Sequence, residues 1–327
     1  PEEKEIEMKI VFIIPRWPKD SFWDVIAFKF PLLSTPLLAA LTPSRHQMSI
    51  IDESLSEIDF EQEVDLVAIT ALTPLAPRGY EIADQFRKRG RKVVIGGIHA
   101  SWLPEEAKIH SDSVVIGEAD EIWAEVLEDA EKGEMKPFYR QKERTDLGHL
   151  PIPRRDLLPR KGYLFHNLIQ TTRGCPYDCE FCSVTALHGR TYRMRPVSEV
   201  EREIQSLERS KAYIFFVDDN LVGNLSYARE LLTMLSNYRL RWVSQGPIHI
   251  AENEELVSFM AKAGCHGLFI GFESLREENL NLMGKRINRI EAYENGIQRL
   301  HDAGIGVYAS FVFGYDYDDP SVFDEFL

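Results

Sequence analysis

The sequence predicts an α/β protein built from two successive parallel-sheet domains. A length of 327 residues exceeds one average domain, so two are expected. Short runs rich in Val and Ile alternate with amphipathic helical segments, which is the pattern of parallel sheets covered on both faces. A segment rich in charge and proline separates two series of such units. We therefore expect a first domain over 8–133, a linker over 134–167 and a second domain over 168–327.

The first series predicts a doubly wound, Rossmann-like sheet. Helices are expected at Tyr80–Gly90 and Glu121–Gly133, where apolar residues recur with helical spacing. No G-x-G-x-x-G follows the first strand, so the sequence does not indicate a dinucleotide site. The expected strands are Lys9–Pro15, Gln47–Asp52, Asp65–Thr70, Lys92–Gly97 and Ser113–Gly117.

Residues that follow three of these strands are candidates for a ligand site, because ligands of such sheets bind beyond the carboxyl ends of the strands. Glycine lets a bulky flat ligand approach the backbone, and hydroxyl groups can bond to its polar rim. Each position also fits an ordinary strand-to-helix turn, so both interpretations stay open. The candidates are Thr73, Gly96, Gly97, His99, Ser101, Gly117 and Glu118.

The linker prediction depends on Glu134–Asn167, which contains Leu150-Pro151-Ile152-Pro153. Proline at this density disfavours regular structure, so we expect a stiff, extended connector.

The second series predicts a partial (β/α) barrel, because five strand–helix units follow one another. The sequence ends inside what should be the next helix, at Leu327. The last unit is therefore missing from the pattern, and we expect either a piece of a longer chain or a barrel that something else completes. Expected strands are Leu168–Thr172, Tyr213–Val217, Trp242–Gln245, Gly267–Phe272 and Gly306–Gly314, with helices at Pro196–Arg209, Tyr227–Tyr238, Glu254–Gly264 and Arg289–Gly304.

Three of the four cysteines, Cys175, Cys179 and Cys182, lie in one loop after the first strand of this series, with the spacing C-x3-C-x2-C. Three thiolates on one loop suit a [4Fe–4S] cluster that leaves one iron open for a further ligand. Zinc with His188 as a fourth ligand is the alternative, although zinc sites favour two separated pairs. Cys265 is expected to be a buried structural thiol.

Composition excludes several classes of partner. The chain carries 52 acidic and 38 basic residues, a net charge of −14, which argues against binding a nucleic-acid backbone. The basic run Arg87–Lys92 closes an expected helix, where cations complement the helix dipole. No apolar run approaches the roughly 20 residues of a membrane span. The cysteine pattern is not that of a disulfide framework, so we expect a cytoplasmic protein.

The cysteine loop, with Phe181 before its last cysteine and a strand before and a helix after it, resembles the radical S-adenosylmethionine (SAM) superfamily. The resemblance implies that Cys175, Cys179 and Cys182 hold a [4Fe–4S] cluster whose open iron chelates SAM. It also implies that an external electron donor reduces the cluster, and that SAM cleavage then yields a 5′-deoxyadenosyl radical.

Three further stretches resemble strand motifs of that superfamily: Phe215–Asn220, Gly271–Ser274 and Ser310–Gly314. The alternatives are that Asp218 and Asp219 cap the following helix and that Glu273 pairs with Lys285. The sequence does not decide which aspartate faces SAM. The SAM contacts that the resemblance and the charges imply are Phe181, Asp218, Asp219, Glu273, Ser274, Arg195, Val312 and Phe313.

The first domain resembles the cobalamin-binding domain that precedes the barrel in one radical SAM subfamily, through Thr35–Leu41, Ile51-Asp52, Gly96–His99 and Gly117-Glu118. The D-x-H-x-x-G signature of histidine-ligated cobalamin is absent. The resemblance therefore implies cobalamin without a protein histidine beneath the cobalt, and His99 is the residue that would overturn this.

The combined resemblance is to cobalamin-dependent radical SAM enzymes, loosely the subgroup that includes hopanoid C-3 methylases. It implies a methyltransferase that acts on an unactivated carbon through a 5′-deoxyadenosyl radical and methylcobalamin. Oxidative cyclisation or ring rearrangement without methyl transfer is one alternative, and a cobalamin-binding or sensing module with an inactive barrel is another. Aromatic residues near the predicted mouth are compatible with an apolar or ring-containing small molecule: Trp17, Trp23, Tyr192 and Tyr308.

Overall fold

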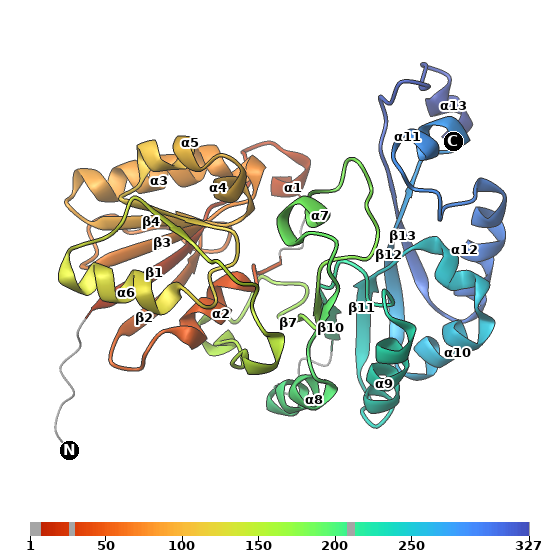
Figure 1. Cartoon of the computed structure of the whole chain (residues 1–327), viewed down its shortest axis with the longest axis horizontal. Coiled ribbons are helices and arrows are strands. Elements are labelled where there is room, and N and C mark those ends of the chain that lie inside the picture. Colours follow the sequence, from red (N-terminus) through yellow and green to blue (C-terminus); the bar gives the residue numbers. More distant parts are fainter. Residues whose placement is uncertain (1–7, 26–29, 208–212, 327) are drawn as a thin grey trace. The chain divides into compact units, whose positions relative to one another are not determined.

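The structure is a computed structural model that describes residues 8–25, 30–207 and 213–326. The chain forms two compact units, residues 1–166 and 167–327 (Figure 1). Each unit is built on its own parallel sheet, so the predicted α/β fold class is confirmed.

The first unit contains a six-stranded parallel sheet with the order β2-β1-β3-β4-β5-β6. The order reverses between β1 and β3, so the sheet is doubly wound, as predicted. All five predicted strands are present, with ends within one residue of the prediction. The strands are β1 (Lys9–Ile14), β2 (Gln47–Asp52), β3 (Leu66–Thr70), β4 (Lys92–Gly96), β5 (Ser113–Ile116) and β6 (Phe138–Arg140).

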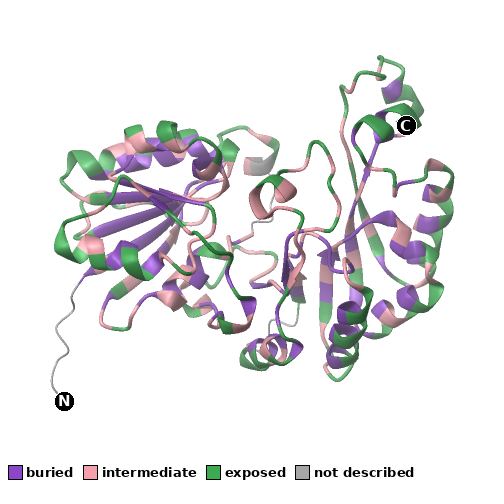
Figure 2. Ribbon diagram, in the orientation of Figure 1, coloured by how far each residue is buried: buried purple, intermediate pink, exposed green. Residues whose placement is uncertain are grey.

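Two apolar cores lie on the two faces of this sheet, and its four inner strands, β1, β3, β4 and β5, are buried over most of their length (Figure 2). Successive residues of β1 show why: Val11 packs into one core and Phe12 into the other. Figure 1 shows α3, α4 and α5 on one face and α2 and α6 on the other. The helices are α1 (Phe22–Val25), α2 (Ser34–Leu41), α3 (Ala76–Lys88), α4 (Ile98–Trp102), α5 (Pro104–His110) and α6 (Trp123–Lys132), with a short 3-10 turn, η1 (Thr73–Leu75).

The predicted extended linker differs from the structure. Its residues up to His166 belong to the first unit, because β6 pairs in parallel with β5 and Leu147, Leu150 and Leu158 are buried. A three-residue strand is too short to show a period, and isolated leucines within a proline-rich stretch form no recognisable apolar pattern. The segment also contains the short turns η2 (Leu147–His149) and η3 (Arg155–Leu157).

The second unit contains a five-stranded parallel sheet with the order β13-β12-β11-β10-β7. Figure 1 shows α9, α10 and α12 along one face, and one apolar core joins these helices to the strands. Among the described residues the sheet stays open between β7 and β13, as a partial barrel does. The strands are β7 (Asn167–Ile169), β10 (Tyr213–Phe216), β11 (Arg241–Gln245), β12 (Cys265–Glu273) and β13 (Gly306–Phe311).

Helices and short turns link these strands. They are α7 (Ser183–His188), α8 (Val197–Ser206), α9 (Leu225–Leu235), η4 (Ile248–Glu252), α10 (Glu254–Lys262), α11 (Glu277–Leu282), η5 (Ile290–Ala292), α12 (Tyr293–Asp302) and α13 (Val322–Phe326). The predicted end of the helix Pro196–Arg209 lies outside the described residues. Within the described ranges, no helix is long and apolar enough to cross a bilayer.

One predicted strand is divided in two. Leu168–Thr172 becomes β7 and the short β8 (Thr172–Arg173), which pairs antiparallel with β9 (Arg193–Met194). The break occurs because the backbone N–H of Thr171 donates to the Asp218 side chain instead of a neighbouring strand.

Candidate functional site

The cysteine loop, residues 174–182, connects β8 to α7. Cys175, Cys179 and Cys182 are all free thiols, and each is half-buried. Burial raises the pKa of Cys175 and Cys179, while N–H donors and the Lys285 cation oppose the shift. Bound iron would stabilise the thiolates that burial disfavours.

Gly174 determines how the loop leaves β8. Its φ of +93° lies in the left-handed region, and a Cβ there would lie 2.1 Å from the Thr191 carbonyl oxygen. Only glycine avoids both the strain and the clash. The turn that presents Cys175 therefore depends on the residue just before it.

Asp218 is fully buried beneath this loop. Its carboxylate accepts hydrogen bonds from the hydroxyls of Thr171 (2.8 Å) and Thr172 (2.6 Å) and from the Thr171 N–H (3.1 Å). Burial raises its pKa to about 6, and these donors oppose the shift. Asp218 was predicted as a SAM contact, but its oxygens are occupied and turned away from solvent. It is a structural carboxylate that holds the strand end.

Asp219 and Asn220 point to the cysteine loop instead. Asp219 accepts from the Gly174 N–H at 3.1 Å, and burial raises its pKa. The Asn220 amide lies 3.8 Å from the Cys175 sulfur, within range of a weak hydrogen bond. Of the two aspartates that the sequence left undecided, only Asp219 is partly exposed.

Glu273 ends β12 in a left-handed conformation, with φ of +69°, where the pairing with β13 is irregular. This backbone is rare outside glycine and directs the side chain toward Lys285, with which it forms an ion pair. The pairing is the alternative that the sequence left open. Both side chains are about nine-tenths buried, and the Lys285 ammonium also lies 5.9 Å from the centre of the Phe181 ring.

Loops after four strands touch the cysteine loop. Besides Asn220 after β10, the His249 ring contacts the Tyr177 hydroxyl (3.4 Å) after β11. After β12, the Met283 carbonyl accepts from the Glu180 N–H (2.9 Å). After β13, the Tyr315 hydroxyl donates to the Glu180 carboxylate (3.3 Å). The loop therefore lies at the carboxyl ends of the strands, where (β/α) barrels place their sites.

Arg195, predicted as a SAM contact, has a buried acidic partner in the structure. Its guanidinium is 4% exposed and forms an ion pair with Glu203, which is 1% exposed. A charge buried in such a pair is not available at the surface of the loop. Lys285 is close enough to Cys179 to oppose the rise that burial causes in the pKa of that thiol.

The other predicted SAM contacts are near the ends of β12 and β13. Ser274 is buried, and its hydroxyl accepts from the Arg276 N–H at 3.0 Å. Val312 donates its N–H to the Glu273 carbonyl at 2.9 Å, so the two strand-end motifs are joined. Phe313 is exposed, and its ring stacks near Phe311.

The two cysteine alternatives have different geometry. Among the described residues, no three His, Cys, Asp or Glu side chains converge on a single metal ion. A four-iron cube is wider than one ion, so its cysteines surround it without converging on one point. The His188 ring, the proposed fourth zinc ligand, contacts Arg193 (3.5 Å). Three free, half-buried thiols on one loop fit the cluster. As predicted, Cys265 is buried at the start of β12.

In the first unit, the predicted cobalamin contacts gather at the carboxyl ends of β3, β4 and β5. The Ser101 hydroxyl donates to the Gly97 carbonyl (2.8 Å) and accepts from the Gly117 N–H (2.9 Å), which joins the ends of β4 and β5. Gly97 has φ of +98°, and a Cβ there would lie 2.9 Å from the Thr70 hydroxyl. Gly117 and Thr73 are exposed at the same edge.

Two members of that set have structural partners. His99 is 7% exposed and its ring contacts Glu106 (3.2 Å) on α5, so it is not presented at the edge as a pocket residue. Glu118 accepts from the Thr145 N–H at 3.1 Å. Gly96, the last residue of β4, is half-buried. Of the aromatic residues near the predicted mouth, Tyr308 is exposed and Tyr192 donates to the Asn220 carbonyl, while the Trp23 side chain lies outside the described part.

Sequence reasoning missed His249, Tyr315 and the role of Lys285 beside Cys179. Each lies in a loop after a strand, and the only signal was that position. Asn220 was quoted within a motif but without a role.

Two family models match the chain. The model of the radical SAM superfamily matches residues 169–327, and the model of the B12 binding domain matches residues 38–127. The two matches fall in the second and the first unit, respectively.

Relatives of known name cover most of the chain. A bacteriochlorophyllide d C-8(2)-methyltransferase of Chlorobaculum tepidum is 31% identical over 89% of this chain and 68% of its own length. A C-12(1)-methyltransferase of the same pigment and organism is 29% identical, covering 98% and 72%. The hopanoid C-3 methylase of Methylococcus capsulatus is 26% identical, covering 92% and 64%.

A solved structure shows the same fold. The radical SAM methyltransferase TsrM of Kitasatospora setae, with cobalamin and a [4Fe–4S] cluster bound, has a TM-score of 0.73 at 20% identity, covering 97% of this chain and 72% of its own. The chain belongs to the cobalamin-dependent radical SAM family, as an enzyme of the methyltransferase type. Its cofactors are a [4Fe–4S] cluster, SAM and cobalamin.

Proposed function

We propose that this enzyme methylates an unactivated carbon of an apolar, ring-containing small molecule. The observation that carries the proposal is the cysteine loop, which bears three free thiols and is contacted by loops from four strand ends, within a radical SAM domain that follows a B12 binding domain. When bound, the cluster and SAM would supply a radical able to abstract hydrogen, and cobalamin would supply the methyl group.

The proposed role of Cys175, Cys179 and Cys182 is to hold the cluster through three of its irons. Asn220 would tune it by donating to the Cys175 sulfur. Glu273 and Lys285 present opposite charges side by side next to Cys179. Such a pair matches an amino acid: when SAM binds, Lys285 would exchange Glu273 for the SAM carboxylate, and Glu273 would accept from the SAM ammonium group. We assign them to the methionine part of SAM, in place of Arg195 and Asp218.

At the edge of the first sheet, Gly97 and Gly117 would let the corrin ring approach the backbone, while Ser101 fixes the two turns. Reduction of the cluster requires an electron from outside, so we propose a separate one-electron donor as a partner.

Relatives support the substrate class. Bacteriochlorophyllide d and hopanoids, which two groups of relatives methylate, are both large, largely apolar molecules with several rings. A tetrapyrrole is the first substrate to test, because the relatives that act on bacteriochlorophyllide d have 31% and 29% identity.

A second candidate is oxidative ring closure without methyl transfer. An anaerobic magnesium-protoporphyrin IX monomethyl ester cyclase of Cereibacter sphaeroides is 25% identical over 84% of this chain and 50% of its own length. The two candidates differ in their by-products. Methyl transfer consumes a second SAM and releases S-adenosylhomocysteine, whereas ring closure does not.

The test uses anaerobically reconstituted protein with cobalamin, SAM, a chemical reductant and either bacteriochlorophyllide d or a hopanoid. We expect 5′-deoxyadenosine, S-adenosylhomocysteine and a product heavier by one methylene unit. Cys179→Ala should produce no 5′-deoxyadenosine, and Cys265→Ala is the matched control because Cys265 is buried in the sheet. Deoxyadenosine without S-adenosylhomocysteine would favour ring closure, and undiminished deoxyadenosine from Cys179→Ala would refute the cluster assignment.

A further inference from the structure

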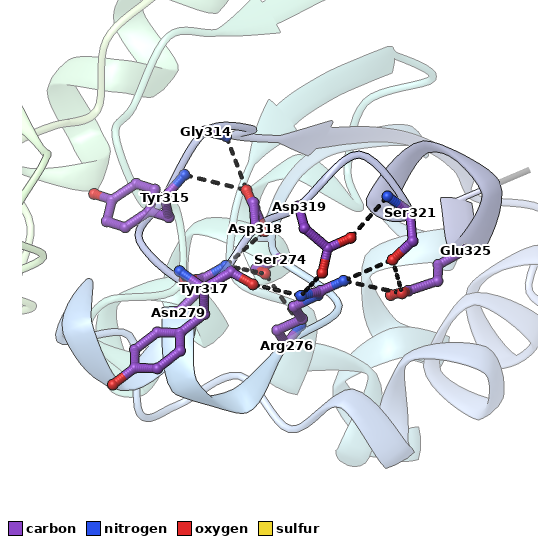
Figure 3. Close-up of polar contacts among 10 residues, drawn as sticks. All are labelled: Ser274, Arg276, Asn279, Gly314, Tyr315, Tyr317, Asp318, Asp319, Ser321 and Glu325. Atoms are coloured by element: carbon purple, nitrogen blue, oxygen red, sulfur yellow. Dashed lines mark hydrogen bonds and ion pairs between the residues drawn. The ribbon is translucent and has the colours of Figure 1, made fainter.

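A loop beyond the last strand is bound to the start of α11 by side chains rather than by strand pairing (Figure 3). We call residues Gly314–Ser321 the terminal loop. The Arg276 guanidinium donates to the Tyr317 carbonyl, to Asp319 (3.2 Å) and to the Ser321 hydroxyl (3.1 Å). It also donates to Glu325 in α13 (3.0 Å). The planar guanidinium of Arg276 thus holds the terminal loop at several points.

Asn279 and Asp318 hold the other side of the terminal loop. The Asn279 amide donates to Asp318 (2.7 Å), and its carbonyl accepts from the Tyr317 N–H (3.1 Å). The second oxygen of Asp318 accepts from the N–H groups of Gly314 (2.8 Å) and Tyr315 (3.1 Å). Asn279 is fully buried, so this connection does not depend on a mobile surface side chain. Asp318 therefore fixes the backbone of Tyr315.

Tyr315 is the point where the terminal loop reaches the cysteine loop. Its hydroxyl donates to the Glu180 carboxylate (3.3 Å), while the Glu180 N–H donates to Met283 just beyond α11 (2.9 Å). The contacts close a ring: Glu180 to Met283, along α11 to Asn279, through Asp318 to Tyr315, and back to Glu180. Because Glu180 lies between Cys179 and Phe181, this ring restrains the backbone that carries both.

We propose that Tyr315 is a positioning residue for the cysteine loop, and that Arg276, Asn279 and Asp318 hold it in that role. The contacts keep Cys179 and Phe181 in place where the cluster would bind, so loosening them would make a bound cluster easier for oxygen to reach. This inference rests on the proposed placement of the cluster at Cys175, Cys179 and Cys182, but it does not depend on the substrate or on methyl transfer.

The test compares Tyr315→Phe with Tyr317→Phe in the reconstituted full chain. Tyr317 is a matched control, because its backbone is hydrogen-bonded to Arg276 and Asn279 while its aromatic side chain is exposed. We expect both variants to bind as much iron as wild type. In Tyr315→Phe, however, the cluster absorption should bleach about threefold to tenfold faster in air, as loss of one exposed hydrogen bond of ordinary strength allows.

The second readout is the change that SAM causes in the electron paramagnetic resonance spectrum of the reduced cluster. Tyr315→Phe should need several-fold more SAM for half of this change, and Tyr317→Phe should behave as wild type. Asp318→Ala, which leaves the Tyr315 hydroxyl intact but frees its backbone, should reproduce both effects.

Two outcomes distinguish a failure of the positioning role from a failure of the proposed cluster placement. Wild-type bleaching and SAM response in both Tyr315→Phe and Asp318→Ala would overturn the positioning role while leaving the cluster assignment standing. A Cys179→Ala protein that still binds the full cluster would overturn the proposed placement, and the positioning role with it.

Discussion

The Asp218 carboxylate accepts a hydrogen bond of 2.6 Å from the hydroxyl of Thr172, 46 residues earlier in the chain. Thr171 donates to the same oxygen, at 2.8 Å. This bond network anchors the start of the cysteine loop to the end of β10. Asp218, which the sequence predicted as a SAM contact, therefore has a structural role at the end of β10.

We expect the unfolding free energy of the second unit to depend on pH because Asp218 titrates. Its pKa is raised to about 6 in the folded state, so the folded protein holds the proton more tightly than the unfolded chain, whose aspartates titrate near ~3.9. Its contribution to stability is therefore present at low pH and lost as the pH rises through 6. Relative to Asp218→Asn, wild type should gain about 1 kcal/mol of unfolding free energy between pH 7 and pH 5.

Urea unfolding at several pH values measures this difference. Subtracting the variant removes the contributions of other groups that titrate in the same range, which the two proteins share. Asp302→Asn, at an exposed position on α12, is the control and should parallel wild type. A wild-type curve parallel to that of Asp218→Asn would contradict the raised pKa.

Gly174→Ala should abolish cluster binding. The new Cβ would lie 2.1 Å from the Thr191 carbonyl oxygen, so the backbone before Cys175 must move. Gly304→Ala is the control: its φ of +78° is also left-handed, but no atom lies within 4 Å of the added Cβ. It should cost only about 1 kcal/mol of stability. Iron content after reconstitution is the measurement, and equal iron in the two variants would refute the steric argument.

Substitutions of Glu273 and Lys285 should have strongly coupled effects on the free energy of unfolding. Both are about nine-tenths buried, so Lys285→Met leaves an unpaired buried carboxylate and should destabilise the second unit by about 3 kcal/mol. Glu273→Gln with Lys285→Met should recover much of that loss. A double-mutant cycle by urea unfolding measures the coupling. The exposed pair Arg229 and Glu255 provides the comparison and should show no measurable coupling.

Cobalamin bound to this chain should have no protein histidine as its lower ligand. His99 is buried against Glu106, and its ring is not presented at the sheet edge. Any nitrogen splitting in the electron paramagnetic resonance spectrum of bound cob(II)alamin should therefore come from the base of cobalamin itself. His99→Gln should leave that spectrum unchanged, whereas Gly97→Ala should weaken cobalamin binding. Nitrogen splitting that disappears in His99→Gln would show that the histidine does bind cobalt.

Strand positions in both units were predictable because buried parallel strands need continuous apolar runs. The run Lys9–Ile14 is an example, since its alternate residues enter different cores. The strand β6 was not predictable, because Phe138–Arg140 has three residues and its stability comes entirely from pairing with β5. The local sequence pattern does not indicate which strand such a segment pairs with.

The cysteine loop itself was predictable from spacing, because three thiols within eight residues can reach one cluster whatever the rest of the chain does. The partners of the charged residues around it were not. Arg195 and Lys285 have the same charge, and only packing decides that Arg195 is buried against Glu203 while Lys285 lies beside Cys179.

The sequence by itself determined the α/β class, the two sheets and the cysteine motif, because each follows from residue types and spacing within a short stretch. The tertiary structure alone decided that Asp218 is scaffold while Asp219 approaches the loop, that His99 is engaged by Glu106, and that Tyr315 reaches Glu180. These are contacts between residues brought together by folding, and a side chain's role depends on which partner its backbone brings within hydrogen-bond reach.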